Sequence, residues 1–199
     1  MFNIKWIGII QEEDIKKYQK GELNSNAIQM NTPNTVGQVQ RKSIPFMIGA
    51  FLIIFATMFI KTYFAKSIVV NFPFIFIGVI ISFVLLFIHE LLHAIVYPRK
   101  VIKYIGIVKP FTPVALASYP LSKKRFICMS LLPYILGLIP LIIFIISSPD
   151  STILNAIVFG MTFMGLSSPA PDAYNVCQII KQVPKGKKVQ FYEDDIYYI

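Results

Sequence analysis

Long apolar stretches alternate with basic, polar segments along this chain. Four stretches carry almost no charge, namely 44–60, 68–97, 126–147 and 153–166. A helix rises about 1.5 Å per residue, so about 20 residues are needed to cross about 30 Å of hydrocarbon. The second and third stretches meet this length, and the first reaches it with its flanks. The pattern therefore predicts about four transmembrane helices.

The fourth apolar stretch is short. It crosses a bilayer if its helix continues through Ser167 and Ser168 toward Pro169, or if the bilayer thins locally. The alternative is a re-entrant segment that enters and leaves on the same side. The sequence leaves both readings open.

The segments outside these stretches have their own patterns. Residues 11–20 suit a short surface helix, and 21–43 is rich in Asn, Gln, Thr and Pro, which favours a loop or linker. Residues 99–125 contain one weakly alternating run with β-branched residues, V-I-K-Y-I-G-I-V, and a second run, F-T-P-V-A-L-A-S-Y-P, that also suits extended structure. The predicted class is an all-α membrane protein with a small extended or β segment after the second helix. We expect residues 1–43 as an N-terminal segment, 44–175 as a four-span membrane domain and 176–199 as a C-terminal tail.

Composition supports the membrane assignment. Of 199 residues, 55% are hydrophobic and only 15% are charged, whereas an ordinary soluble domain carries about 25% charge. So small a chain has too little core to hide this much apolar surface from water. These values exclude a disordered chain, a disulfide scaffold and a typical cytosolic enzyme.

The basic residues predict the orientation. The chain has nineteen Lys and Arg residues and a net charge of +9. All of them except Lys61 and Lys66 precede the first stretch, separate the second from the third, or follow the fourth. Basic loops stay in the cytoplasm, so we expect a multi-pass cell-membrane protein with both termini cytoplasmic. Nucleic-acid binding is not expected, because the basic residues flank spans and form no separate basic and aromatic stripe.

The second apolar stretch contains the motif H-E-L-L-H. His89 and His93 are the two histidines of the chain, and Glu90 follows the first of them. Positions four apart lie on one face of a helix, so both imidazoles can bind one ion while Glu90 takes a proton from its water. The alternative is a structural or pH-sensing cluster. Ionisable groups in membrane helices are costly and usually functional, which favours a metal site.

A third ligand is needed, because zinc in hydrolases usually has three protein ligands and one water. Most acidic residues lie in the terminal segments, but Asp172 follows the fourth stretch in the run S-P-A-P-D-A-Y-N. His89 lies about 12 Å from the end of its helix, toward the side to which the fourth stretch returns. Pro169 and Pro171 interrupt that helix and free its backbone to turn. We expect Asp172 to be the ligand, with Asn175 orienting its carboxylate; the alternative role is a helix cap.

These motifs resemble a known class. H-E-L-L-H near the end of one membrane helix, followed by P-A-P-D, resembles the site-2 proteases, which are intramembrane zinc metalloproteases. The order of features is more closely similar to small bacterial zincin peptidases related to that class, over roughly residues 75–195. The third zinc ligand of site-2 proteases is the Asp of an N-P-D-G-like or L-D-G motif, and Asp172 matches it. Ala173 departs from the pattern, because that class has Gly there.

The residues and the resemblance predict a membrane-embedded zinc metallopeptidase. His89, His93 and Asp172 would bind Zn²⁺, and Glu90 would be the general base for hydrolysis of membrane-associated peptides or proteins. The resemblance implies that extended segments in 99–125 pair with substrate as an added strand. Alternatively, this loop is a basic interfacial segment bound to anionic lipid. The rival function is a non-catalytic metal-binding scaffold or sensor, which would have no need of Glu90 beside a ligand.

Overall fold

The computed structural model describes residues 3–33 and 35–199. It is mostly helical, at 59%, and the chain divides into two compact units. The sheet unit consists of the described residues of Met1–Lys42 together with His89–Leu132 and Pro171–Ile199. The helical unit consists of Ser43–Ile88 and Pro133–Ala170.

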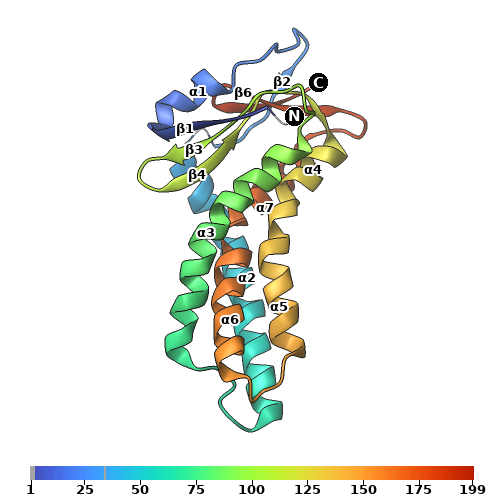
Figure 1. The fold of residues 1–199 in the computed structure, drawn as a ribbon. Helices are drawn as coiled ribbons and strands as arrows, with labels where there is room; N and C mark the ends of the chain where they lie inside the picture. The colour runs from blue at the N-terminus through green and yellow to red at the C-terminus, as the bar shows by residue number, and fades with distance from the viewer. Residues whose placement is uncertain (1–2, 34) are drawn as a thin grey trace. The chain divides into compact units, whose positions relative to one another are not determined.

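Four helices supply the helical unit, two of them only in part. They are α2 (Val36–Ala65), α3 (Phe72–Val96), α5 (Ile135–Ile146) and α6 (Thr152–Ser167), as Figure 1 shows. With the short helices that extend α5 and α6, the described residues contain four helices long and apolar enough to cross a membrane. The prediction of about four such helices is confirmed. The fourth runs over Thr152–Gln182 and is 31 residues long, so its length suffices for a span.

Glycines allow the helices of this unit to approach closely. A Cβ placed on Gly137 of α5 would lie 2.5 Å from the carbonyl carbon of Gly165 on α6. Gly78 and Gly160 make a similar close approach. A Cβ on Gly78 of α3 would collide with the backbone of α6, and a Cβ on Gly160 of α6 would collide with the backbone of α3. Small residues at such crossings bring helix backbones together where apolar burial alone supplies little attraction. The core between them is formed by residues such as Ile54, Phe144 and Phe159.

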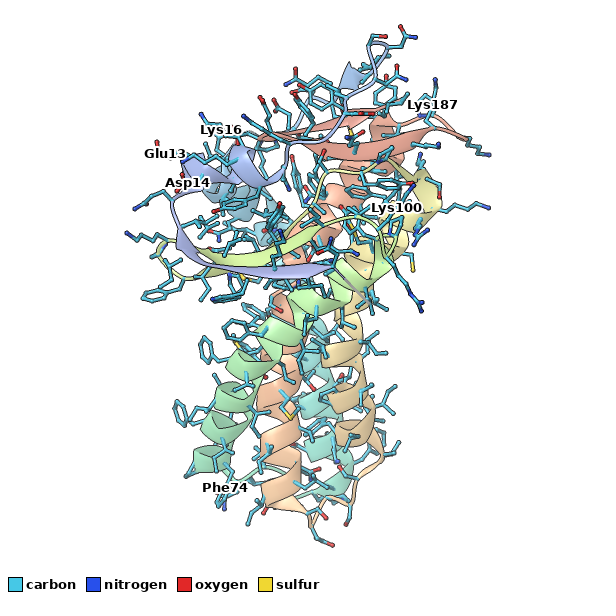
Figure 2. All side chains as sticks on the ribbon, turned by 45° about the horizontal axis from the view of Figure 1, so that its top comes forward. Glu13, Asp14, Lys16, Phe74, Lys100 and Lys187 are labelled. Carbon is cyan, nitrogen blue, oxygen red and sulfur yellow. The ribbon has the colours of Figure 1, made fainter. Side chains whose placement is uncertain are left out.

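The outside of the helical unit is apolar. Phe59, Phe64 and Phe76 expose 70%, 78% and 72% of their surface, and Figure 2 shows the side chains that surround these helices. A soluble protein rarely presents so many neighbouring apolar groups to water. The length and composition of the helices and this exposed surface together indicate a multi-pass membrane protein.

The sheet unit contains a three-stranded sheet in the order β1-β3-β4. Its strands are β1 (Ile4–Ile10), β3 (Lys103–Val108) and β4 (Thr112–Leu116). β3 and β4 form an antiparallel hairpin in which Ile105 faces Ala115, and β1 runs parallel to β3. The hairpin confirms the extended structure predicted after the second long helix.

A second sheet has the order β2-β7-β6-β5. Its strands are β2 (Ile28–Gln29), β5 (Leu121–Ser122), β6 (Lys188–Tyr192) and β7 (Asp195–Tyr198). The short helices of the unit are η1 (Glu12–Asp14), α1 (Ile15–Tyr18), α4 (Lys123–Leu131) and α7 (Ala170–Gln182), and η2 (Leu132–Tyr134) follows α4. The predicted surface helix in 11–20 is confirmed by η1 and α1.

The predicted class, all-α, was too narrow. Strands form at both ends of the described chain, in the parts that the sequence predicts only as an N-terminal segment and a C-terminal tail. Val189 and Ile196 of this tail are buried in one core with Phe126 and Ile179, so the last strands are part of the fold. The expected linker at 21–43 is also partly structured, because β2 lies within it and α2 begins at Val36.

Candidate metal centre

Two histidines meet at the end of α3 that belongs to the sheet unit. His89 and His93 lie one turn apart, with their Nε2 atoms 3.1 Å from each other. His89 exposes 7% of its side chain and His93 exposes 12%. As the helical period predicts, both imidazoles lie on one face of α3, and their Nε2 atoms lie next to each other.

Asp172 joins them from the first turn of α7. Its Oδ2 atom lies 3.3 Å from Nε2 of His89, and its Oδ1 atom lies 3.4 Å from Nε2 of His93. One ligand atom from each residue falls within 4.8 Å of the others. The carboxylate therefore faces both imidazoles, which favours the predicted ligand role over that of a helix cap.

The donor set fits zinc. Two imidazole nitrogens and one carboxylate oxygen are ligands that catalytic zinc sites commonly combine, with a fourth position left for water. The three side chains lie close enough for one ion, and all three come from the sheet unit. Residues 3–33 and 35–199 contain no other group of three or more His, Cys, Asp or Glu side chains with this geometry.

Glu90 borders this cluster without joining it. Its Oε1 atom lies 3.9 Å from Nε2 of His89, and only 8% of the residue is exposed. The backbone amide of Ala115 in β4 faces the Glu90 carboxylate. The β3–β4 hairpin, which forms within the 99–125 loop, therefore reaches the residue expected to act as the base.

One contact of the cluster was missed by sequence reasoning. Nδ1 of His93 lies 3.0 Å from the backbone carbonyl oxygen of Met129 in α4. We expected Asn175 to orient Asp172 instead, but the described residues show no hydrogen bond between Asn175 and Asp172. A backbone carbonyl leaves no mark in the residue type, so Met129 itself offered no signal.

Hydrogen bonds link the end of α3 and the residues after it to other parts of the sheet unit. The Arg125 guanidinium donates to the Val96 carbonyl through Nε at 2.8 Å and also through a terminal nitrogen. Lys103 is fully buried in β3, and its Nζ donates to the Pro98 carbonyl at 2.8 Å. The side chain of Ser122 accepts from the Arg125 amide and caps the start of α4. These bonds hold the chain that follows His93.

Burial changes the acidity of two groups beside this end. It raises the pKa of the Tyr97 hydroxyl above its ordinary value, and it lowers the pKa of the Lys103 ammonium. In both cases the cause is loss of water, which disfavours the charged form. Tyr97 therefore stays neutral and packs in the core with Phe126 and Met129.

The fold and the cluster together define a class of multi-pass membrane protein with a histidine and carboxylate site at the end of one long helix. A family model described as "Putative zincin peptidase" matches residues 82–188, a little over half of the 199 residues. The chain belongs to this family. The match includes His89, Glu90, His93 and Asp172. No curated protein and no solved structure matches the chain.

Membership of a zincin family implies metallopeptidase activity and zinc. Both agree with the chemistry of the donor set. The resemblance to small zincin peptidases, stated from the motifs alone, is confirmed by the family match.

Proposed function

We propose that this protein is a membrane-embedded zinc metallopeptidase that cleaves membrane-associated peptides or proteins, in the manner of site-2 proteases. The observation that carries this proposal is the meeting of His89, His93 and Asp172 beside Glu90. These residues come from helices distant in the sequence, α3 and α7, yet their ligand atoms lie within 4.8 Å of one another.

Each residue has a proposed task. Nε2 of His89, Nε2 of His93 and a carboxylate oxygen of Asp172 hold the metal. Zinc, when bound, supplies a Lewis acid that makes its water more acidic and polarises the peptide carbonyl. Oε1 of Glu90 takes a proton from the attacking water and later delivers it to the leaving amine. The Ala115 amide keeps the Glu90 carboxylate directed into the site.

The substrate and the orientation follow from the surroundings. A site carried near the end of a long apolar helix is suited to substrates that are themselves in or at the bilayer. The distribution of Lys and Arg supports termini in the cytoplasm; Lys16, Lys100 and Lys187, for example, project outward from the sheet unit (Figure 2). An open strand edge gives unfolded peptide a place to pair, and β4 lies at the edge of its sheet beside Glu90.

The test is Glu90→Gln in the full chain, reconstituted in vesicles with single-span model peptides. We expect cleavage to fall by about 10²- to 10⁴-fold, the usual contribution of a general base. Bound zinc, measured by elemental analysis, should stay near the wild-type stoichiometry, because Glu90 is not among the three ligands. Peptide fragments are quantified by mass spectrometry.

Glu13→Gln is the matched control. Glu13 is an exposed residue of η1 at the outer edge of the sheet unit, as Figure 2 shows. The Glu13→Gln variant should cleave the model peptides like the wild type. Wild-type cleavage by Glu90→Gln would contradict the assigned base. Stoichiometric zinc in a wild type that cleaves none of the peptides would favour the metal-binding scaffold or sensor.

A further inference from the structure

The helix that contacts His93 has an irregular end. α4 spans Lys123–Leu131, and the Leu132 amide still donates to the Cys128 carbonyl as in an α-helix. The next helical bond would run from the amide of residue 133 to the Met129 carbonyl. Residue 133 is proline, which has no N–H to donate. The Met129 carbonyl therefore lacks its ordinary helical partner.

Such a carbonyl needs another donor. Met129 is 4% exposed, and a buried carbonyl without a hydrogen bond is unfavourable, because it has lost its bond to water. The donor present is Nδ1 of His93, at 3.0 Å. Figure 1 shows α4 beside the last turns of α3, which is where this bond forms.

The bond fixes which nitrogen of His93 carries the proton. A carbonyl only accepts, so the hydrogen must be on Nδ1. In the neutral imidazole, Nε2 is then the unprotonated nitrogen, and only an unprotonated nitrogen can bind a metal ion. Nε2 is also the atom that faces Asp172 at 3.4 Å and His89 at 3.1 Å. The carbonyl thus selects the tautomer and the ring orientation that the cluster requires.

We propose that Pro133 is a positioning residue of the metal site: by leaving the Met129 carbonyl without a helical donor, it makes that carbonyl available to hold His93 with Nε2 directed at the metal. This inference rests on the proposed zinc site. It adds a residue that binds neither metal nor substrate and that acts through the backbone of α4. Partners of this kind commonly change metal affinity by about 10- to 100-fold.

The first variant is Pro133→Ala in the full-length protein in detergent. Alanine restores an N–H that competes for the Met129 carbonyl. We expect zinc affinity, measured by competition with a chelator, to fall by about 10-fold or more. In the zinc-loaded protein, the His93 Nδ1 proton should also exchange faster with water. Because the chain has two histidines, ¹⁵N-histidine labelling gives a spectrum of two imidazoles only.

A second variant separates the missing donor from the proline ring. Alanine is replaced at 133 by its hydroxy-acid analogue, lactic acid, which has an ester oxygen in place of the N–H and has no ring. If the free carbonyl is what matters, this ester variant should bind zinc like the wild type while Pro133→Ala binds weakly. Equal loss in both variants would assign the effect to the ring and overturn the inference.

Pro140→Ala is the matched control, because it changes a proline in α5, eleven residues beyond Met129 along the chain. It should leave zinc affinity and the His93 proton unchanged. Wild-type affinity and wild-type proton exchange in Pro133→Ala would overturn the inference while the zinc site stands. A wild type that binds no zinc would overturn the proposed function and the inference with it.

Discussion

The helical unit and the sheet unit are stabilised in different ways. The helical unit is formed by long apolar helices from two parts of the chain that pack through glycines, and its outside is apolar. The sheet unit joins strands from three separate parts of the chain, and it holds every residue of the candidate site. The difference indicates that the apolar helices provide the membrane location, whereas the chemistry depends on pairings between residues far apart in the sequence.

Each unit also contains a lysine whose ammonium donates to backbone carbonyl groups. Lys61 of the helical unit donates to the Ser147 carbonyl at 2.9 Å and to Oδ1 of Asn155 at 3.1 Å, and it also contacts the Phe144 carbonyl. Lys103 of the sheet unit donates to the Pro98 carbonyl. Backbone carbonyl groups are therefore partners of a half-buried lysine in one unit and of a fully buried lysine in the other.

The largest predicted effect is a loss of zinc affinity that follows a substitution in the sheet unit and not one in the helical unit. Asp172→Ala should reduce zinc affinity by more than about 100-fold, because it removes a ligand rather than the partner of a ligand. Asp150→Ala, at an exposed position of the helical unit, should bind zinc like the wild type. Zinc is measured by chelator competition on purified protein. Unchanged affinity in Asp172→Ala would remove Asp172 from the ligand set.

The next effect tests packing in the helical unit. Gly137→Leu places a side chain against the backbone of Gly165 and forces α5 and α6 apart. We expect unfolding in detergent to become easier by about 3 kcal/mol, at the upper end of ordinary overpacking. Gly49→Leu in α2 is the control, because nothing lies within 4 Å of a Cβ placed there. Equal stability of the two variants would show that α5 and α6 do not need this close approach.

The same contrast explains what the sequence could predict of the fold. Long apolar runs and local turn residues are sufficient to find helices, and the four long helices were found. β1 pairs with β3, about a hundred residues away, and β6 pairs with β5 and β7. Short strands gain their stability from such partners, which a reading along the chain does not supply. The sequence therefore predicts the terminal parts only as an N-terminal segment and a tail.

The grouping of the candidate site residues in space was predicted more fully than the sheets around them. His89, Glu90 and His93 share one helix, so their arrangement follows from its period. Asp172 can be selected as the third ligand because few acidic residues lie outside the terminal segments. The Met129 carbonyl was missed, because backbone groups have no residue signature. The sequence does contain one indication of it, namely Pro133, which removes the helical N–H donor for the Met129 carbonyl. This indication can be interpreted only when His93 is known to lie beside α4.

The smallest predicted effect concerns pH and the sheet unit alone. Burial lowers the pKa of Lys103 below its ordinary value of 10.5. Between the lowered value and 10.5, the unfolded chain therefore binds more protons than the folded chain, so the free energy of unfolding rises with pH in this window. Below the lowered value, Lys103 is protonated in both states and contributes no slope. Lys103→Met should remove this rise, because methionine keeps the apolar stem and has no proton to lose.

The measurement is the difference in unfolding midpoint between wild type and Lys103→Met in detergent at about pH 7, 8.5 and 10, a range that extends toward the ordinary lysine value. Groups common to both proteins cancel in this difference. The wild type should gain stability relative to the variant as the pH increases. Parallel curves would mean that Lys103 titrates alike in the folded and unfolded chains, and its burial in β3 would then carry no electrostatic cost. A relative loss in the wild type would mean that the protonated lysine is stabilised by the fold, as a cation held by the Pro98 carbonyl would be if that bond outweighed the loss of water.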